Sequence, residues 1–207
     1  LPKIKCISAG YAYTCVVTNK GAIYSWGAGQ DGRLGNNTEI DSCIPVKLYT
    51  DWVADSIETG STHTVAISRN KKLYSWGSAH YNGHNIKQPT LVPKKIESIK
   101  NIMFYKVSIG YGGYHTLALS YAGNVYSWGH NRVGQLGTSI SNCVKNDIEN
   151  MAWYNPTPCI CESLIGIPVV NISAGWGHSA IITLNNKIYM CGRNFRGQIG
   201  INPIHCQ

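Results

Sequence analysis

The sequence predicts an all-β protein, a β-propeller of four-stranded antiparallel blades, with about four blades along its 207 residues. One motif recurs four times at intervals of 50 to 63 residues, and such a long period is typical of propellers and solenoids. Each copy contains short runs of period two separated by tight turns. The composition, with 43% hydrophobic and 14% charged residues, agrees with a packed β core.

The four copies share one internal register. Each has an anchor glycine three residues before a His or Tyr, and the anchors are Gly10, Gly60, Gly112 and Gly175, spaced by 50, 52 and 63 residues. Sixteen residues after the anchors stand Trp26, Trp76, Trp128 and Cys191, each followed by glycine. Three copies then carry a Gly-x-x-Gly pair, whereas the second has Asn82 to Asn85 in its place. The constant glycines and tryptophans are expected to form the scaffold of each blade.

Each copy is expected to contain four strands. In the third copy, residues 115–120 and 124–128 form a hairpin around a turn at 121–123, and a further strand at 106–109 precedes the anchor. Proline-containing runs at 45–48 and 89–93 predict outer strands, because proline is tolerated at sheet edges. We expect a single partial propeller domain over 1–207, with repeats at about 1–44, 45–88, 89–155 and 156–207 and an insertion within 138–168.

The repeat resembles a known one. The motif Gly-x-x-His-Thr, then Gly-x-Val-Tyr-Ser-Trp-Gly, then Gly-Gln-Leu-Gly is similar to the repeat of the regulator of chromosome condensation family, and the similarity covers essentially the whole chain. Other propeller repeats have different signature residues. The resemblance implies a seven-bladed propeller, of which this chain is a partial, open ring inside a longer protein; a closed four-bladed ring is the alternative. An open ring leaves two blade edges free for self-association.

Histidine recurs at one position of the motif, as His63, His115 and His178, with Tyr13 in the first copy. One interpretation is structural: each imidazole fixes a loop by hydrogen bonding between blades. The other follows from the resemblance, because residues of this motif face the small GTPase Ran in the family's nucleotide-exchange members. Those members place acidic residues after some anchors, whereas this chain has Tyr11, Ser61, Gly113 and Trp176 there.

Aromatic residues outside the constant positions are candidate partner contacts. Trp176 resembles the tryptophans in the loops of ultraviolet-B photoreceptors of the family, but those proteins need a cluster of such residues. Trp153 and Tyr154 lie in the long third interval, which forms either a projection that contacts a partner or an outer connection that covers its own blade. The cysteines at 143, 159 and 161 lack the usual zinc spacing and an obvious fourth ligand, so we expect no metal site.

The net charge of +8 suggests a basic face at Lys71, Lys72, Lys94 and Lys95, which either meets an acidic partner, nucleosome or DNA or is simply solvated. The sequence contains no catalytic motif, no cofactor-binding motif and no stretch as long as a membrane span, so we expect an intracellular protein, nuclear or cytoplasmic, without a cofactor.

The sequence therefore predicts a non-enzymatic protein-interaction propeller, part of a longer chain. Two alternatives stay open: a guanine-nucleotide exchange factor for a Ran-like GTPase with chromatin binding, and the recruiting or regulatory domain of a larger enzyme. Exchange involves no covalent chemistry, because the factor acts by binding the nucleotide-free GTPase better than the loaded form.

Overall fold

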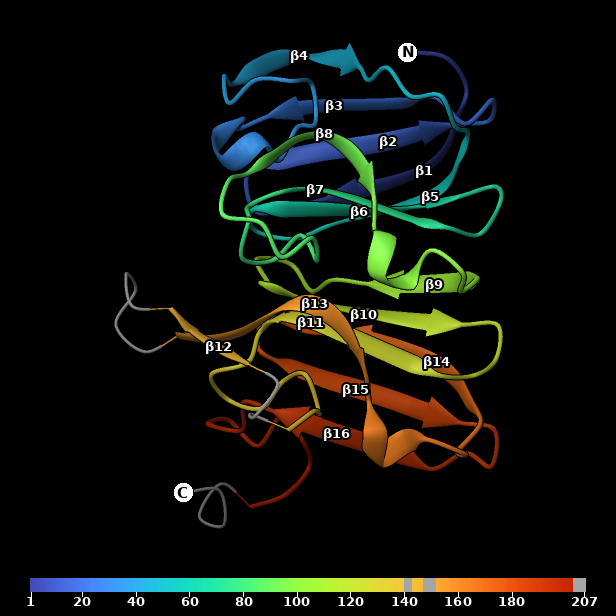
Figure 1. The fold of residues 1–207 in the computed structure, drawn as a ribbon, viewed down its shortest axis with the longest axis vertical. Helices are drawn as coiled ribbons and strands as arrows, with labels where there is room; N and C mark the ends of the chain where they lie inside the picture. The colour runs from blue at the N-terminus through green and yellow to red at the C-terminus, as the bar shows by residue number, and fades with distance from the viewer. Residues whose placement is uncertain (140–142, 147–151, 203–207) are drawn as a thin grey trace.

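The computed structural model describes residues 1–139, 143–146 and 152–202, and these form a row of antiparallel sheets, the blades, stacked side by side (Figure 1). Blade one contains β1 (Ile4–Ala9), β2 (Tyr13–Thr18), β3 (Ile23–Gly27) and β4 (Ser42–Lys47). Blade two contains β5 (Ala54–Thr59), β6 (His63–Ser68), β7 (Leu73–Gly77) and β8 (Thr90–Lys95). Blade three contains β9 (Phe104–Ser108), β10 (His115–Ser120), β11 (Val125–His130) and β13 (Ala152–Ile160), extended by β12 (Val144–Asn146). Blade four contains β14 (Val169–Ala174), β15 (His178–Thr183) and β16 (Ile188–Gly192).

The predicted all-β propeller of four-stranded blades is confirmed. Blades one and two each have four strands in chain order, blade three has the same four plus β12 at its outer edge, and blade four shows three strands within the described residues. In the part of the chain that the structure describes, three short 3-10 helices, η1 (Gln30–Gly32), η2 (Glu97–Ile99) and η4 (Glu162–Leu164), lie in connections between strands. Blade one and blade four lie at opposite ends of the row (Figure 1).

The hairpin turns lie where the sequence predicts them. In all four copies one turn residue has a positive φ, namely Gly21 (82°), Lys71 (62°), Gly123 (79°) and Asn186 (58°). Glycine and asparagine adopt this conformation at little cost, whereas a lysine there is less usual. The hairpins therefore share one backbone geometry although their turn residues differ.

The outer strands return to the blade that precedes them. Ser25 of β3 pairs with Val46 of β4, and Ser75 of β7 pairs with Lys94 of β8. Pro45 and Pro93 lie in these edge strands, as expected. The sheets consequently end at residues 47, 95 and 160, later than the repeat limits at 44, 88 and 155 expected from the sequence, because each outer strand folds back onto its own hairpin.

The core lies between blades as well as within them. Trp76 and Trp128 are fully buried, and each packs with side chains of the preceding blade. A Cβ atom on Gly35 would lie 2.6 Å from the Trp76 indole nitrogen, and one on Gly83 would lie 3.1 Å from that of Trp128. The second copy, which lacks the Gly-x-x-Gly pair, thus keeps the one glycine on which the next tryptophan packs.

Candidate protein-interaction face

The loop between β9 and β10 changes the register expected for the third copy. Ser8 pairs with Cys15 and Ser108 pairs with Leu117, so both serines hold the same place in their blades. The glycine two residues after Ser108 is Gly110, and the loop from there to β10 is two residues longer than in the other copies. The expected anchor Gly112 is therefore wrong for this position, which Gly110 occupies.

This correction places an aromatic residue directly after the glycine in three of the four copies. These residues are Tyr11, Tyr111 and Trp176, with exposed fractions of 63%, 68% and 54%. The Tyr11 and Tyr111 ring centroids are 6.4 Å apart. A Cβ atom on Gly112 would lie 3.4 Å from the Trp176 ring and 3.9 Å from the Tyr11 ring, so Gly112 lies between these two rings. Three loops from three blades thus bring exposed aromatic rings together. We call these residues, with Arg193 and Phe195, the aromatic face.

Arg193 completes the aromatic face next to Trp176. Its guanidinium carbon lies 4.6 Å from the centroid of the Trp176 ring and 4.9 Å from that of Phe195. The backbone N–H of Arg193 donates to the carbonyl oxygen of Gly177 at 2.8 Å, which fixes the loop after β16 beside the loop before β15. A guanidinium between two rings is a favourable cation–π arrangement, so both exposed rings are held in place.

A cavity of about 510 Å³ opens beside the aromatic face. Its walls come from blades two, three and four and include two arginines and no carboxylate. Neither arginine forms an ion pair with a described acidic residue. Gln135 and His130 are hydrogen-bonded to one another in the wall, with 2.6 Å between Nε2 and Nδ1. The cavity therefore combines apolar walls with positive charge. The principal lining residues are Tyr81, Tyr114, Arg132, Trp176, Arg193 and Phe195.

The recurrent histidines lie beneath this surface. His63 and His115 are fully buried, and their Nε2 atoms lie 2.8 Å from Thr116 Oγ1 and 2.9 Å from Ser179 Oγ, each in the next blade. Tyr13 makes the corresponding contact, since its hydroxyl lies 2.9 Å from Thr64 Oγ1. The buried histidines therefore join blades, which supports the structural interpretation of the motif and leaves their side chains out of reach of a partner.

His178 differs from the other two histidines. It is half-buried, and its ring makes no hydrogen bond to a described residue. It holds the position of His63 and His115 but belongs to the last described blade. Partner contact by a histidine of this motif stays a prediction for His178.

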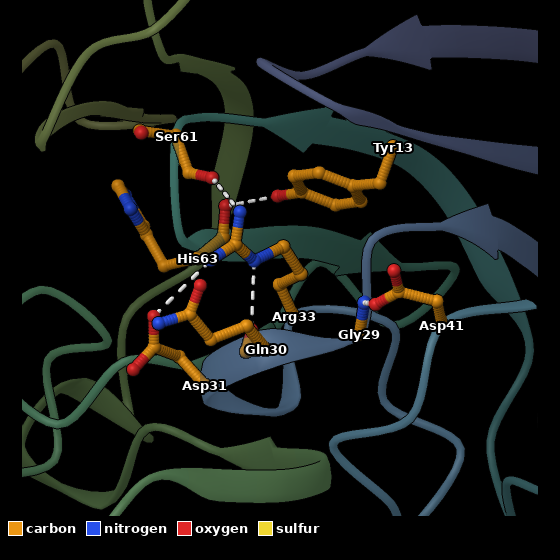
Figure 2. A network of polar contacts seen from close by, with 8 residues as sticks. All are labelled: Tyr13, Gly29, Gln30, Asp31, Arg33, Asp41, Ser61 and His63. Atoms are coloured by element: carbon orange, nitrogen blue, oxygen red, sulfur yellow. Dashed lines mark hydrogen bonds and ion pairs between the residues drawn. The ribbon is translucent and has the colours of Figure 1, made fainter.

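Arg33 forms a second junction between blades one and two, together with Tyr13 (Figure 2). It is 5% exposed and donates to the carbonyl oxygens of Gln30 at 2.7 Å and Ser61 at 3.1 Å, and its guanidinium lies 3.2 Å from an Asp31 oxygen. Tyr13 donates to the carbonyl oxygen of His63 at 2.6 Å. These groups satisfy one another inside the protein, so the region in Figure 2 is structural.

Trp153 and Tyr154 lie on β13, where the described part of the insertion pairs with β12 (Figure 1). Both side chains are half-buried, and the Tyr154 ring meets His80 of blade two edge-on with 5.0 Å between centroids. The backbone of Trp153 accepts a hydrogen bond from Asn131 at 2.7 Å. The described part of the insertion thus extends its own blade and contacts its neighbour; a role in partner binding stays a prediction.

The four candidate lysines are not equally available. Lys71 forms an ion pair with Asp55 at 2.7 Å, and Lys72 donates to the carbonyl oxygen of Ile102. Lys5 and Lys71 together hold the pKa of the Asp55 carboxyl below its usual value. Lys94 is exposed and Lys95 half-buried on the outer strand β8. Two members of the predicted basic face are therefore already engaged in structural contacts.

Within residues 1–139, 143–146 and 152–202, no group of three or more potential metal ligands comes together. The cysteines considered for zinc are all free thiols, and Asn131 and Asn155 donate to the sulfurs of Cys143 and Cys159. None of the described helices is long and apolar enough to cross a membrane.

The fold is that of a β-propeller built from sequence repeats, and exposed aromatic residues gather on one of its loop-bearing faces. The Regulator of chromosome condensation (RCC1) repeat matches this chain over residues 20–67 and 122–182, and a second description of the same repeat matches 4–33, 54–83, 107–135 and 169–198. These last four segments contain the hairpins of the four blades. The chain therefore belongs to the regulator of chromosome condensation (RCC1) repeat family.

Curated relatives differ in function. The chain is 31% identical over 203 residues to the Ultraviolet-B receptor UVR8 of Arabidopsis thaliana, with 96% of this chain and 43% of the receptor covered. It is 30% identical over 206 residues to the Probable E3 ubiquitin-protein ligase HERC6 of Homo sapiens, with 97% of this chain and 19% of the ligase covered. The chain thus spans less than half the length of these relatives.

Solved structures share the fold. Yeast RCC1 (Prp20), in its complex with Kap60, has a TM-score of 0.82 at 22% identity, covering 97% of this chain and 46% of the yeast chain. Human WBSCR16 has a TM-score of 0.79 at 23% identity, covering 100% of this chain and 52% of the human one. At this identity the similarity establishes the architecture only.

The sequence singles out Trp176 as a candidate partner contact, which stays a prediction, but it does not single out the other members of the aromatic face. In the sequence, Tyr11 stands out only because it occupies a position that is acidic in some family members. Tyr111 does not stand out, because the expected anchor of the third copy, Gly112, follows it rather than precedes it. Arg193 and Phe195 follow the Cys191-Gly192 pair, and a comparison of the loops after the tryptophan position would have been needed to find them.

Proposed function

We propose that this propeller is a protein-interaction module that binds a segment of a partner protein at the aromatic face and the adjoining cavity. The single observation that carries the proposal is the stack of Trp176, Arg193 and Phe195 at the mouth of a 510 Å³ cavity. Tryptophan, tyrosine and arginine are the residues most enriched among those that dominate binding energy at protein interfaces.

The chemistry of the cavity specifies the partner segment. Tyr81 and Tyr114, whose ring centroids are 5.1 Å apart, supply apolar walls, while Arg132 and Arg193 supply positive charge without a nearby described carboxylate. A segment that carries Asp or Glu beside an aromatic or aliphatic anchor satisfies both features. Exposed apolar rings that cluster in this way also mark interaction surfaces in general.

A peptide library tests the proposal with the purified chain. We expect the selected peptides to be enriched in acidic residues next to one large apolar residue. Trp176→Ala and Arg193→Ala are each expected to weaken binding of a selected peptide about tenfold, measured by fluorescence anisotropy. Tyr49→Ala is the matched control, because Tyr49 is 93% exposed and follows the far end of β4. Selected peptides that bind all variants equally would place the site elsewhere.

Nucleotide exchange on a Ran-like GTPase is the second candidate. Supporting it, a structure of Prp20p from Saccharomyces cerevisiae, reported with its binding properties to Gsp1p and histones, has a TM-score of 0.81 and 22% identity to this chain. Against it, none of Tyr11, Ser61, Tyr111 and Trp176 supplies a carboxylate after the glycine. The test is release of a fluorescent guanine nucleotide from Ran; no acceleration at micromolar concentration of the full-length protein rejects this candidate.

Chromatin binding would use Lys94 and Lys95 rather than Lys71 and Lys72, which have partners within the protein. Binding of DNA or nucleosomes through these lysines should weaken steeply as salt increases, because phosphate contacts release counterions. Affinity that is equal at 50 and 200 mM salt would contradict a role for the basic face.

A recruiting role inside a larger enzyme is the third candidate. It is supported by the ubiquitin-protein ligase relatives, of which this chain covers 19% in one case and 18% in another. The full-length sequence tests it directly, since a catalytic domain outside these 207 residues is required.

A further inference from the structure

A second cavity, of about 100 Å³, lies between blades three and four, where one position of the repeat differs from the others. Strand pairing identifies that position. Trp76 pairs with Thr64 and Trp128 with Thr116, whereas Cys191 pairs with Ser179. Cys191 therefore stands exactly where a buried tryptophan stands in the two preceding blades.

The tryptophans fill the junctions that precede them. Trp76 and Trp128 have no exposed surface, and each indole packs against the glycine of the loop in the previous blade. Gly137 holds this place at the third junction, and a Cβ atom on it would lie 3.3 Å from the Cys191 sulfur. A thiol is far shorter than an indole, so the rest of the space is unfilled. The cavity follows directly from the replacement.

The cavity walls are apolar. They include Leu117, Leu136, Ile181, Tyr189 and Met190, with Leu164 of η4 beside them. An apolar cavity is poorly suited to water, which needs two to four polar partners. The molecule that fills this space best is therefore itself apolar.

Ser179 and two cysteines are polar residues of the wall, and none of them carries a charge. The hydroxyl of Ser179 donates to the carbonyl oxygen of Gln135 at 2.7 Å. Burial raises the pKa of the Cys161 and Cys191 thiols to about 11, so both are neutral at physiological pH. No charge in the wall selects for an ion.

We propose that this cavity is a binding site for a small, neutral, planar aromatic molecule that takes the place of the missing tryptophan side chain. An engineered apolar cavity of about 150 Å³ binds benzene without polar contacts. This cavity is smaller, at about 100 Å³, and therefore suits a flat ligand of about one aromatic ring. Cys191 is half-buried, which leaves a route from solvent to the cavity. The site is separate from the aromatic face and does not depend on partner binding there.

Thermal unfolding with indole or benzene as the probe tests the site. A ligand that binds only the folded state raises Tm, and a shift of about 2–4 °C is expected near saturation for a chain of this size. Ligand-observed NMR should show saturation transfer to the same probe. Absence of both the Tm shift and the transfer in the wild-type protein would overturn the proposal.

Variants at the same position make the test specific. Cys191→Trp restores the side chain of the other copies and should raise Tm without a probe while abolishing the effect of indole. Cys191→Phe fills less of the space and covers the case in which the tryptophan variant does not fold. Cys43→Trp is the matched control, because Cys43 is exposed on β4, and it should keep the full effect of indole. Equal indole effects in the wild type and both position-191 variants would refute the assigned site.

Discussion

His115 donates a hydrogen bond from Nε2 to the Oγ of Ser179, 2.9 Å away in the next blade. The direction follows from Ser179, whose hydroxyl proton is used in its bond to the carbonyl oxygen of Gln135, so that the oxygen accepts from the histidine. The unprotonated Nδ1 of His115 has no described hydrogen-bond partner. His115 is therefore held neutral, in one tautomer, at the junction of blades three and four.

Acid should destabilise the chain through these junctions. Burial lowers the pKa of both His63 and His115 to about 3, against a usual value of 6.5. The unfolded chain binds more protons between these values, so stability falls as pH decreases from 6.5 toward 3. We expect the two histidines together to contribute a loss of several kcal/mol between pH 7 and pH 4.5, since one pKa unit corresponds to about 1.4 kcal/mol, and a gain from Glu58 offsets part of this loss. Urea unfolding midpoints across this range provide the measurement.

His115→Gln is the control for the acid effect, because glutamine can donate to Ser179 without titrating. The variant should start less stable at pH 7 but lose less stability on acidification than the wild type. Parallel pH profiles for the two proteins would disprove the assignment to this histidine.

Glu58 should have the opposite pH dependence. Its removal from water raises the pKa of its carboxyl to about 7, although Lys106 and a hydrogen bond from Ser8 act the other way. The folded state then binds more protons than the unfolded one between pH 4.5 and 7, and stability decreases as pH rises through this window. Glu58→Gln should stabilise the chain by about 1–3 kcal/mol at pH 8 and leave it unchanged at pH 4.5. A gain of equal size at both pH values would contradict the proposed cause.

The two buried tryptophans should respond differently to replacement by phenylalanine. Trp76 donates from Nε1 to the carbonyl oxygen of Arg33 at 3.0 Å, whereas Nε1 of Trp128 has no described partner. Trp76→Phe removes packing and a hydrogen bond, while Trp128→Phe removes packing and relieves an unpaired donor. We expect Trp76→Phe to cost about 1 kcal/mol more in free energy of unfolding. Chemical denaturation of both variants measures the difference, and the reverse order would refute it.

Arg33→Lys should lower the free energy of unfolding although lysine keeps the positive charge. The guanidinium donates in different directions to Gln30 and Ser61 and contacts Asp31, a geometry that a single ammonium group does not reproduce. We expect a loss of about 2–3 kcal/mol, typical of breaking a buried charged network. Arg132→Lys, at an exposed arginine, is the control and should change stability by less than about 0.5 kcal/mol. Equal effects would show that Arg33 is not a junction residue.

Much of the architecture could be predicted from sequence, because each blade repeats its pattern of strands, turns and buried tryptophan. The aromatic face could not be predicted in the same way. Gly110, Gly112 and Gly113 lie close together, and only the pairing of Ser108 with Leu117 shows which of them corresponds to Gly10. The histidines were equally ambiguous, since burial at a junction depends on how two blades pack, and that packing is not contained in either repeat alone.

The contacts from Tyr13, His63 and His115 all run from one blade to the hydroxyl side chain of the blade that follows. At each of these three junctions the earlier blade offers an aromatic hydrogen-bonding group and the later blade a Thr or Ser, so the array has a direction. With respect to these hydrogen bonds, a duplicated blade inserted at any of the three junctions would meet a compatible neighbour on both sides. Such interchangeable flanks allow a repeat protein to gain or lose units during evolution without a new interface being invented each time.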